Sequence, residues 1–463
     1  MEFMMAILWH KRPSGFFELF CGLVLMCALS LAPSRAFADH AVHEVKGDHG
    51  LWAWVLPEKD VSFTQIAISF EGGVAAEKED ESGLAALYAT ILEMSHGQED
   101  NEIEFSRLLQ RLGIQVNYSA GVEEIHVSVS IFSEGKSEKV SKAFKFLKDI
   151  FRKPPLSSEV IRRAVRESIA ERHNADSNAE YQARNLWYAK FYKGHRYGVP
   201  LNGDIDVIKD ISTRYAKRSW SRFFNRENVN IVIVGEIDDT SVKEWLDSLY
   251  ETLPEAPSSY PVVVKKPSLS GTPRSFPKWF DTPHSSVLFG QQAVVPNDSR
   301  FRAALVMNYL LDDRLNKSLR EKNGLVYNVT TDLNFFKKSA VFIGSTATET
   351  QSVPKLQELV RSEWARVLGG DIPMDELSYA KINMQGKFNQ NMRFPWARAL
   401  YLMTALEYDL GMDYLSKRNK LVDAVTREDV RSVARDLLRP DDLFFVIVGR
   451  HKPEDFQNIN KTE

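Results

Sequence analysis

Two side chains in the second half of the sequence, Arg320 and Tyr327, are the candidates for chemistry. They stand seven residues apart in the segment LREKNGLVY. A guanidinium and a phenol are donors that can meet negative charge developing on a reacting oxygen in a partly dry cavity. Gly324 lies between them and permits the sharp reversal that brings both to the same side. In the competing interpretation, Arg320 offsets the dipole at a helix C-terminus and Tyr327 packs on a sheet.

No other catalytic arrangement is evident. The sequence has neither a Gly-x-Ser-x-Gly nucleophile elbow nor a phosphate-binding P-loop. Most histidines are scattered without metal-ligand spacing. These are His126, His173, His195, His284 and His451.

The N-terminus has the pattern of a secretory signal. Basic residues precede a short apolar run at 19–32, and Ala36-Phe37-Ala38 fits the small-x-small cleavage pattern. We expect residues 1–38 to be removed by cleavage after Ala38, with an uncleaved membrane anchor as the alternative. Both cysteines, Cys21 and Cys27, lie in this segment, so the mature chain would have no disulfide and no thiolate zinc site. No later apolar run is long enough to cross a membrane.

The elements that must position Arg320 and Tyr327 recur along the chain. VNIVIVGEID and LFFVIVGRHK are each typical of a buried strand stopped by glycine, at Gly235 and, 214 residues later, at Gly449. LLQRLGIQVNYSAG and SLREKNGLVYNVTT each indicate a helix that ends at glycine, at Gly113 and, 211 residues later, at Gly324. A strand and an amphipathic helix follow in both copies. The offsets predict an internal repeat.

The repeat predicts an α+β fold of two homologous domains, each a mixed or antiparallel sheet with helices packed on one face. We place an N-terminal domain at 39–252, a proline-rich linker at 253–274, a C-terminal domain at 275–455 and a tail at 456–463. A chain of 463 residues is long enough for two cores. Its net charge of −3 gives no support to nucleic-acid binding.

These segments, in this order, resemble the pitrilysin/insulinase family of zinc metallopeptidases, which includes the mitochondrial processing peptidase and two-domain bacterial members. The resemblance covers essentially the whole mature chain. It begins at HGLWAWVLPEKDVSFTQIAISFEGGVAAEKEDESGLAALYATILE, continues through GHRYGVPLNGDIDVIKDIS and ends with RLNKSLREKNGLVYNV.

Active members of that family carry His-x-x-Glu-His on the helix after SGLA. The histidines ligate zinc from one helix face, and the glutamate acts as general base. The resemblance places Ala86, Ala89 and Thr90 at these three positions, so we expect no metal and no metal chemistry in this chain. The family's third ligand, a later glutamate, aligns with Glu167, and Glu171 lies one turn further. We favour the interpretation of such a glutamate as a solvated helix charge, since a single carboxylate holds no zinc.

The resemblance gives Arg320 and Tyr327 a role in substrate binding and oxyanion stabilisation. Some bacterial members divide the work between a zinc-bearing subunit and a paralogue that carries the Arg/Tyr pair. The resemblance therefore implies a catalytically incomplete subunit of a heterodimeric periplasmic zinc metallopeptidase. Zinc would lie in the partner, and the substrate would be an unfolded peptide.

Two other interpretations stay open. The chain could be a non-catalytic peptide-binding or scaffolding protein derived from a peptidase, which would bind peptides without hydrolysis. It could also be an autonomous zinc peptidase with an unorthodox site, which would bind about one zinc ion per chain.

Overall fold

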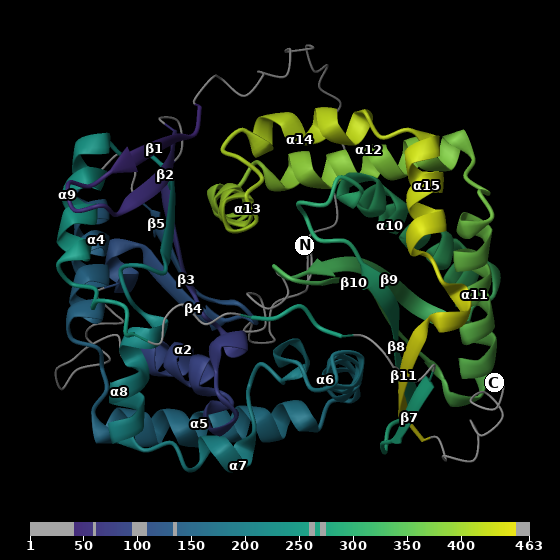
Figure 1. Ribbon diagram of the computed structural model, residues 1–463, viewed down its shortest axis with the longest axis horizontal. Helices are drawn as coiled ribbons and strands as arrows, with labels where there is room; N and C mark the ends of the chain where they lie inside the picture. The colour runs from purple at the N-terminus through teal and green to yellow at the C-terminus, as the bar shows by residue number, and fades with distance from the viewer. Residues whose placement is uncertain are drawn as a thin grey trace, which may run out of the picture.

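The computed structural model describes residues 41–58, 62–94, 109–132, 137–258, 264–268 and 275–450. The expected signal segment 1–38, both cysteines and the expected tail 456–463 lie outside these residues. Two sheets with their covering helices make up the described part of the chain (Figure 1). This architecture confirms the predicted α+β class, while the domain boundaries stay predictions. No helix in the described ranges combines the length and apolar character needed to cross a bilayer.

The first sheet has the strand order β1-β2-β6-β3-β5-β4. Its strands are β1 (His43–Lys46), β2 (Trp52–Pro57), β3 (Phe63–Glu71), β4 (Ile114–Ala120), β5 (Glu124–Phe132) and β6 (Val229–Gly235). The helices of this half are η1 (Val74–Ala76), η2 (Glu79–Glu81), α2 (Leu84–Met94), α4 (Ser137–Arg152), α5 (Ser158–Asp176), α6 (Ala179–Phe191), η3 (Arg196–Gly198), α7 (Ile205–Ile208), α8 (Thr213–Phe223) and α9 (Asp239–Tyr250).

The second sheet has the strand order β7-β11-β8-β10-β9. Its strands are β7 (Ser275–Trp279), β8 (His284–Ala293), β9 (Val326–Phe335), β10 (Ala340–Glu349) and β11 (Phe444–Gly449). The helices of this half are α10 (Phe301–Leu315), η4 (Asn316–Lys322), η5 (Thr350–Ser352), α11 (Val353–Leu368), α12 (Met374–Asn391), α13 (Pro395–Glu407), α14 (Tyr414–Asp423), α15 (Arg427–Leu437) and η6 (Pro440–Asp442).

The two sheets repeat one pairing pattern. In the first, β2 pairs with β6 in parallel, and β6, β3, β5 and β4 follow as antiparallel neighbours. In the second, β7 pairs with β11 in parallel, and β11, β8, β10 and β9 follow in the same way. Gly113 and Gly324 have left-handed φ angles of 67° and 59°. The shared pattern confirms the duplication that the sequence offsets predict.

Each sheet has its own apolar core on one face. In the first half, side chains of β3 and β5 pack with helices α2, α4, α8 and α9. In the second half, side chains of β8 and β10 pack with α10, α11, α12 and α15.

The opposite face of each sheet is covered by a helix from the other half. Helix α13 packs on β3 and β6, and α6 packs on β8 and β11 (Figure 1). Leu402 of α13 belongs to one buried cluster with Val232 of β6. Trp187 of α6 is fully buried against β11, where its Nε1 donates to the Phe444 carbonyl at 3.3 Å. Gly290 of β8 makes room for this tryptophan, because a Cβ there would lie 2.9 Å from the indole ring.

The start of α2 is held by a buried carboxyl group. Glu77 is 3% exposed, and its oxygens accept hydrogen bonds from the backbone N–H groups of Gly83 (2.9 Å) and Ala85 (2.8 Å). Burial raises the pKa of Glu77 to about 8, although these two N–H groups and the charge of Arg196 act in the opposite direction. The position of α2 is therefore linked to a titratable group.

The helix exchange gives a first prediction. We expect Trp187→Ala to lower the free energy of unfolding by about 3–5 kcal/mol, because it leaves a cavity between α6 and the second sheet. Trp279→Ala is the matched control, since Trp279 of β7 is 61% exposed; its change should stay within about 0.5 kcal/mol. Urea unfolding measures both. A loss below about 1 kcal/mol for Trp187→Ala would contradict the importance of this packing.

The Glu77 carboxyl gives a second prediction. The folded state binds this proton more tightly than the unfolded chain does, so ionisation of Glu77 lowers the free energy of unfolding as pH rises from 4.5 to about 8. In Glu77→Gln, the free energy of unfolding should fall less steeply with pH. The difference in slope from the wild type should be up to about 1.4 kcal/mol per pH unit. Urea unfolding across this pH range measures the slope, with the exposed neighbour Glu79→Gln as control. Identical slopes for the wild type and Glu77→Gln would refute it.

Candidate functional site

The three positions aligned with the zinc motif lie on α2 and offer no metal ligand. Ala86 is half-buried, and Ala89 is 7% exposed. Thr90 lies one turn after Ala86, and its Oγ1 donates to the Ala86 carbonyl at 3.2 Å. The one hydroxyl at these positions is thus bound to the backbone of its own helix.

The neighbouring helix α5 packs directly on α2 and carries the aligned glutamate. Glu167 is exposed, and Glu171 is half-buried. A carboxylate on α5 would meet no imidazole or thiolate at the three α2 positions. One carboxylate alone does not hold zinc in a protein site.

Arg320 lies on a π-helical turn at the end of α10. This turn, η4, continues α10 directly. The Gly324 N–H donates to the Arg320 carbonyl at 3.1 Å, and the chain then reverses into β9. Tyr327 is the second residue of that strand. Single π-helical turns within α-helices often mark functional sites.

Both side chains of the pair extend into solvent. The ring of Tyr327 is 93% exposed, so the interpretation in which it packs on the sheet is wrong. Arg320 is also exposed. Neither side chain forms a hydrogen bond, an ion pair or a ring contact with another described residue. The pair is therefore free to contact another molecule, and it lies in a different half from the α2 positions.

The outer edge of β9 is closed by side chains of helix α10 and its π-helical continuation. Asn308 donates to the Thr331 carbonyl at 2.9 Å, and Asp312 accepts from the Thr331 N–H at 2.7 Å. Asn316 donates to the Val329 carbonyl at 2.9 Å. These three side chains stand four residues apart and line a cavity of about 240 Å³. A peptide strand cannot pair with the backbone groups that they occupy.

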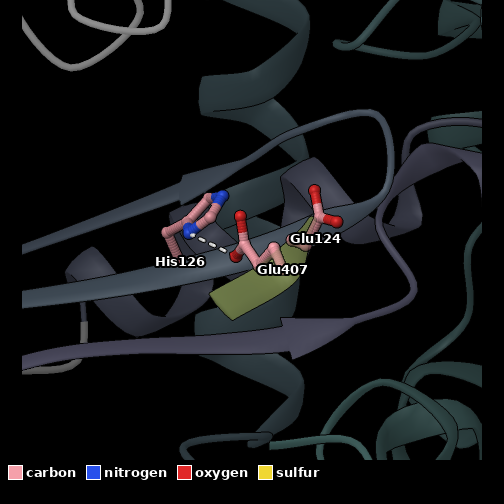
Figure 2. Close-up of side chains that lie close together, drawn as sticks. All are labelled: Glu124, His126 and Glu407. Carbon is pink, nitrogen blue, oxygen red and sulfur yellow. Dashed lines mark ion pairs between the residues drawn. The ribbon is translucent and has the colours of Figure 1, made fainter. Parts of the chain in front are cut away.

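A second polar constellation joins the two halves. Glu124 and His126 of β5 meet Glu407, the last residue of α13, and their ligating atoms all lie within 4.8 Å of one another (Figure 2). Burial raises the pKa of Glu407 and holds that of Glu124 well above its usual range. This group was not predicted from the sequence, in which His126 stands without any metal-ligand spacing to another histidine. The alternation of Glu124 and His126 on one strand face was visible, but the helix that meets them was not.

Comparisons with known proteins match both halves to one family. Residues 54–205 match the model described as "Insulinase (Peptidase family M16)". Residues 213–384 match the model described as "Peptidase M16 inactive domain".

Curated relatives are distant in sequence. The "Non-peptidase homolog YmxG" of Helicobacter pylori is 20% identical over 400 residues, which is 84% of this chain and 89% of that protein. The "Probable inactive metalloprotease YmfF" of Bacillus subtilis is 18% identical, over 51% of this chain and 56% of its own length. An uncharacterized zinc protease of Streptomyces coelicolor is 21% identical, over 60% of this chain and 62% of its own length.

Solved structures share the fold. The crystal structure of a peptidase M16 inactive domain from Pseudomonas fluorescens has a TM-score of 0.81 at 19% identity, and the match covers 89% of this chain and 98% of that one. A protease from Helicobacter pylori has a TM-score of 0.78 at 16% identity, and the match covers 89% of this chain and 99% of that one. The chain therefore belongs to the pitrilysin/insulinase family, peptidase family M16, as a member with Ala86, Ala89 and Thr90 at the zinc-motif positions.

Proposed function

We propose that this chain is the non-zinc subunit of a heterodimeric metallopeptidase and acts with a zinc-bearing paralogue on unfolded peptides. The observation that carries this proposal is the exposure of Arg320 and Tyr327 on a defined helix–strand joint without any side-chain partner among the described residues. Tyrosine usually buries its ring or contacts a partner, and both residue types are enriched at binding surfaces. A periplasmic location is part of the proposal and rests on the signal pattern of residues 1–38.

The chemistry of Arg320 and Tyr327 suits stabilisation of the oxyanion that forms during peptide hydrolysis. In the proposed complex, the activated water and the general base come from the partner's zinc site. Arg320 and Tyr327 donate hydrogen bonds to the substrate carbonyl, whose oxygen gains negative charge during attack. Because the outer edge of β9 is occupied at Val329 and Thr331, the peptide does not pair with β9 at these residues.

A non-catalytic peptide-binding or scaffolding protein is the second candidate. It is favoured by the replacement of all three zinc-motif residues, and one relative bears the name of a non-peptidase homolog. Under this function the chain binds peptides or partners, and no mixture with a paralogue hydrolyses them. The two candidates thus differ in one measurable outcome.

We predict that the purified chain alone is inactive and that mixing it with its zinc-bearing paralogue gives hydrolysis of an unstructured fluorogenic peptide. Tyr327→Phe removes one oxyanion donor and should lower kcat of the mixture by about 10²-fold. Arg320→Ala should reduce it by a similar or larger factor, because the removed donor is charged.

Two matched variants control for indirect effects. Lys322→Ala removes another exposed cation from η4, and Tyr379→Phe removes a hydroxyl from a tyrosine of α12 that is 49% exposed. Both should leave kcat within about twofold of the wild type. Full activity with Tyr327→Phe and Arg320→Ala would overturn the assigned role. A mixture that forms a complex without hydrolysis would favour the scaffolding function.

A further inference from the structure

The joint between the halves contains carboxylate oxygens without a hydrogen-bond partner. The Glu407 side chain is 2% exposed, and its Oε1 accepts no hydrogen bond from any residue that the structure describes. Oε1 of Glu124 is equally unpartnered, in a side chain that is 9% exposed. Buried carboxylates are normally paired or bound to a cation, since an unpaired buried charge is strongly destabilising. Two such oxygens at one place are therefore neutralised either by protons or by a bound cation.

The nearest cations of the protein do not satisfy these oxygens. Lys337 Nζ lies 2.7 Å from Glu71 Oε1 but 3.8 Å from Glu124 Oε1, so its short contact is with Glu71. His126 Nδ1 lies 3.9 Å from Glu407 Oε1, beyond hydrogen-bond distance (Figure 2). His126 and Glu407 thus form only a long ion pair, and the ligating atoms of all three residues lie within 4.8 Å of one another.

The spacing and the chemistry of these donors suit a divalent metal ion. With metal–ligand bonds of about 2.1 Å, two ligands of a tetrahedral zinc ion are about 3.4 Å apart. The Nδ1–Oε1 distance is 3.9 Å and all three ligating atoms lie within 4.8 Å of one another, so the side chains must move closer together to bind one ion. Imidazole nitrogen and carboxylate oxygen are both ordinary zinc ligands.

We propose that Glu124, His126 and Glu407 bind one zinc ion, which fixes the end of α13 to β5 of the first sheet. The two β5 ligands come from one half of the chain and Glu407 from the other, so the ion stabilises the joint between them. We assign the ion a structural role because its ligands come from both halves of the chain, and the three protein ligands leave the fourth position of a tetrahedral zinc ion to a water molecule. The proposal does not depend on the function assigned to Arg320 and Tyr327.

The test is a zinc titration of the purified, chelator-stripped chain against a zinc-binding dye, together with thermal unfolding. We expect one equivalent of zinc to bind and to raise the Tm. Glu407→Gln and His126→Ala should each bind at least about tenfold more weakly and lose the zinc-dependent rise in Tm. Glutamine keeps the size of Glu407 without its charge, so this variant without metal should unfold at or above the Tm of the metal-free wild type.

Two control variants should keep the full zinc response. Glu363→Gln changes another buried glutamate of the second half, which pairs with Arg366 at 3.0 Å. His43→Ala removes a histidine of β1 that pairs with Asp239 at 2.9 Å. The proposal is overturned if the chain shows no saturable zinc binding, or if Glu407→Gln and His126→Ala bind zinc as tightly as the wild type. In the first case, protons rather than a metal neutralise the two carboxylates.

Discussion

Both sheets of this protein are apolar on two faces, and the chain covers the second face of each by exchanging a helix between its halves. The central strands β6 and β11 are almost entirely buried. A strand of this kind needs packing on both sides. Helix α13 supplies it for the first sheet and α6 for the second. This exchange packs each half against the other.

The exchange also explains why charged groups are buried in the middle of the molecule. Lys337 of the second half donates its backbone N–H to Glu123 at 2.7 Å, and Tyr197 donates to the same carboxyl at 2.6 Å. Arg398 of α13 forms an ion pair with Glu58 at the end of the first sheet. These bonds give the joint a defined geometry, since a buried polar group without its partner is costly. Among the described residues of the joint, Oε1 of Glu124 and Oε1 of Glu407 accept no hydrogen bond.

The sequence predicted the parts of the fold that depend on local pattern. Apolar runs ending at Gly235 and Gly449 predicted the central strands, and the glycines at 113 and 324 predicted the helix ends. Local pattern could not predict which sheet α6 and α13 cover, because an amphipathic helix shows an apolar face but not its partner. The exposure of Tyr327 and the meeting of His126 with Glu407 depend on tertiary structure in the same way. The sequence alone showed which positions of α2 lack metal ligands. It could not show the hydrogen bond that the Thr90 hydroxyl donates to the Ala86 carbonyl.

The helix that would carry the zinc ligands and the pair proposed to bind substrate lie in different halves of the chain. Helix α2 packs in the core without metal ligands at Ala86, Ala89 and Thr90. The η4–β9 joint presents Arg320 and Tyr327, whose side chains form no hydrogen bond, ion pair or ring contact with another described residue. The most direct test is to purify the tagged full chain from its own cells and identify what accompanies it. The account predicts a stoichiometric paralogue with His-x-x-Glu-His, and peptidase activity in the complex but not in the isolated chain. A chain that purifies alone, or only with proteins that lack this motif, would contradict it.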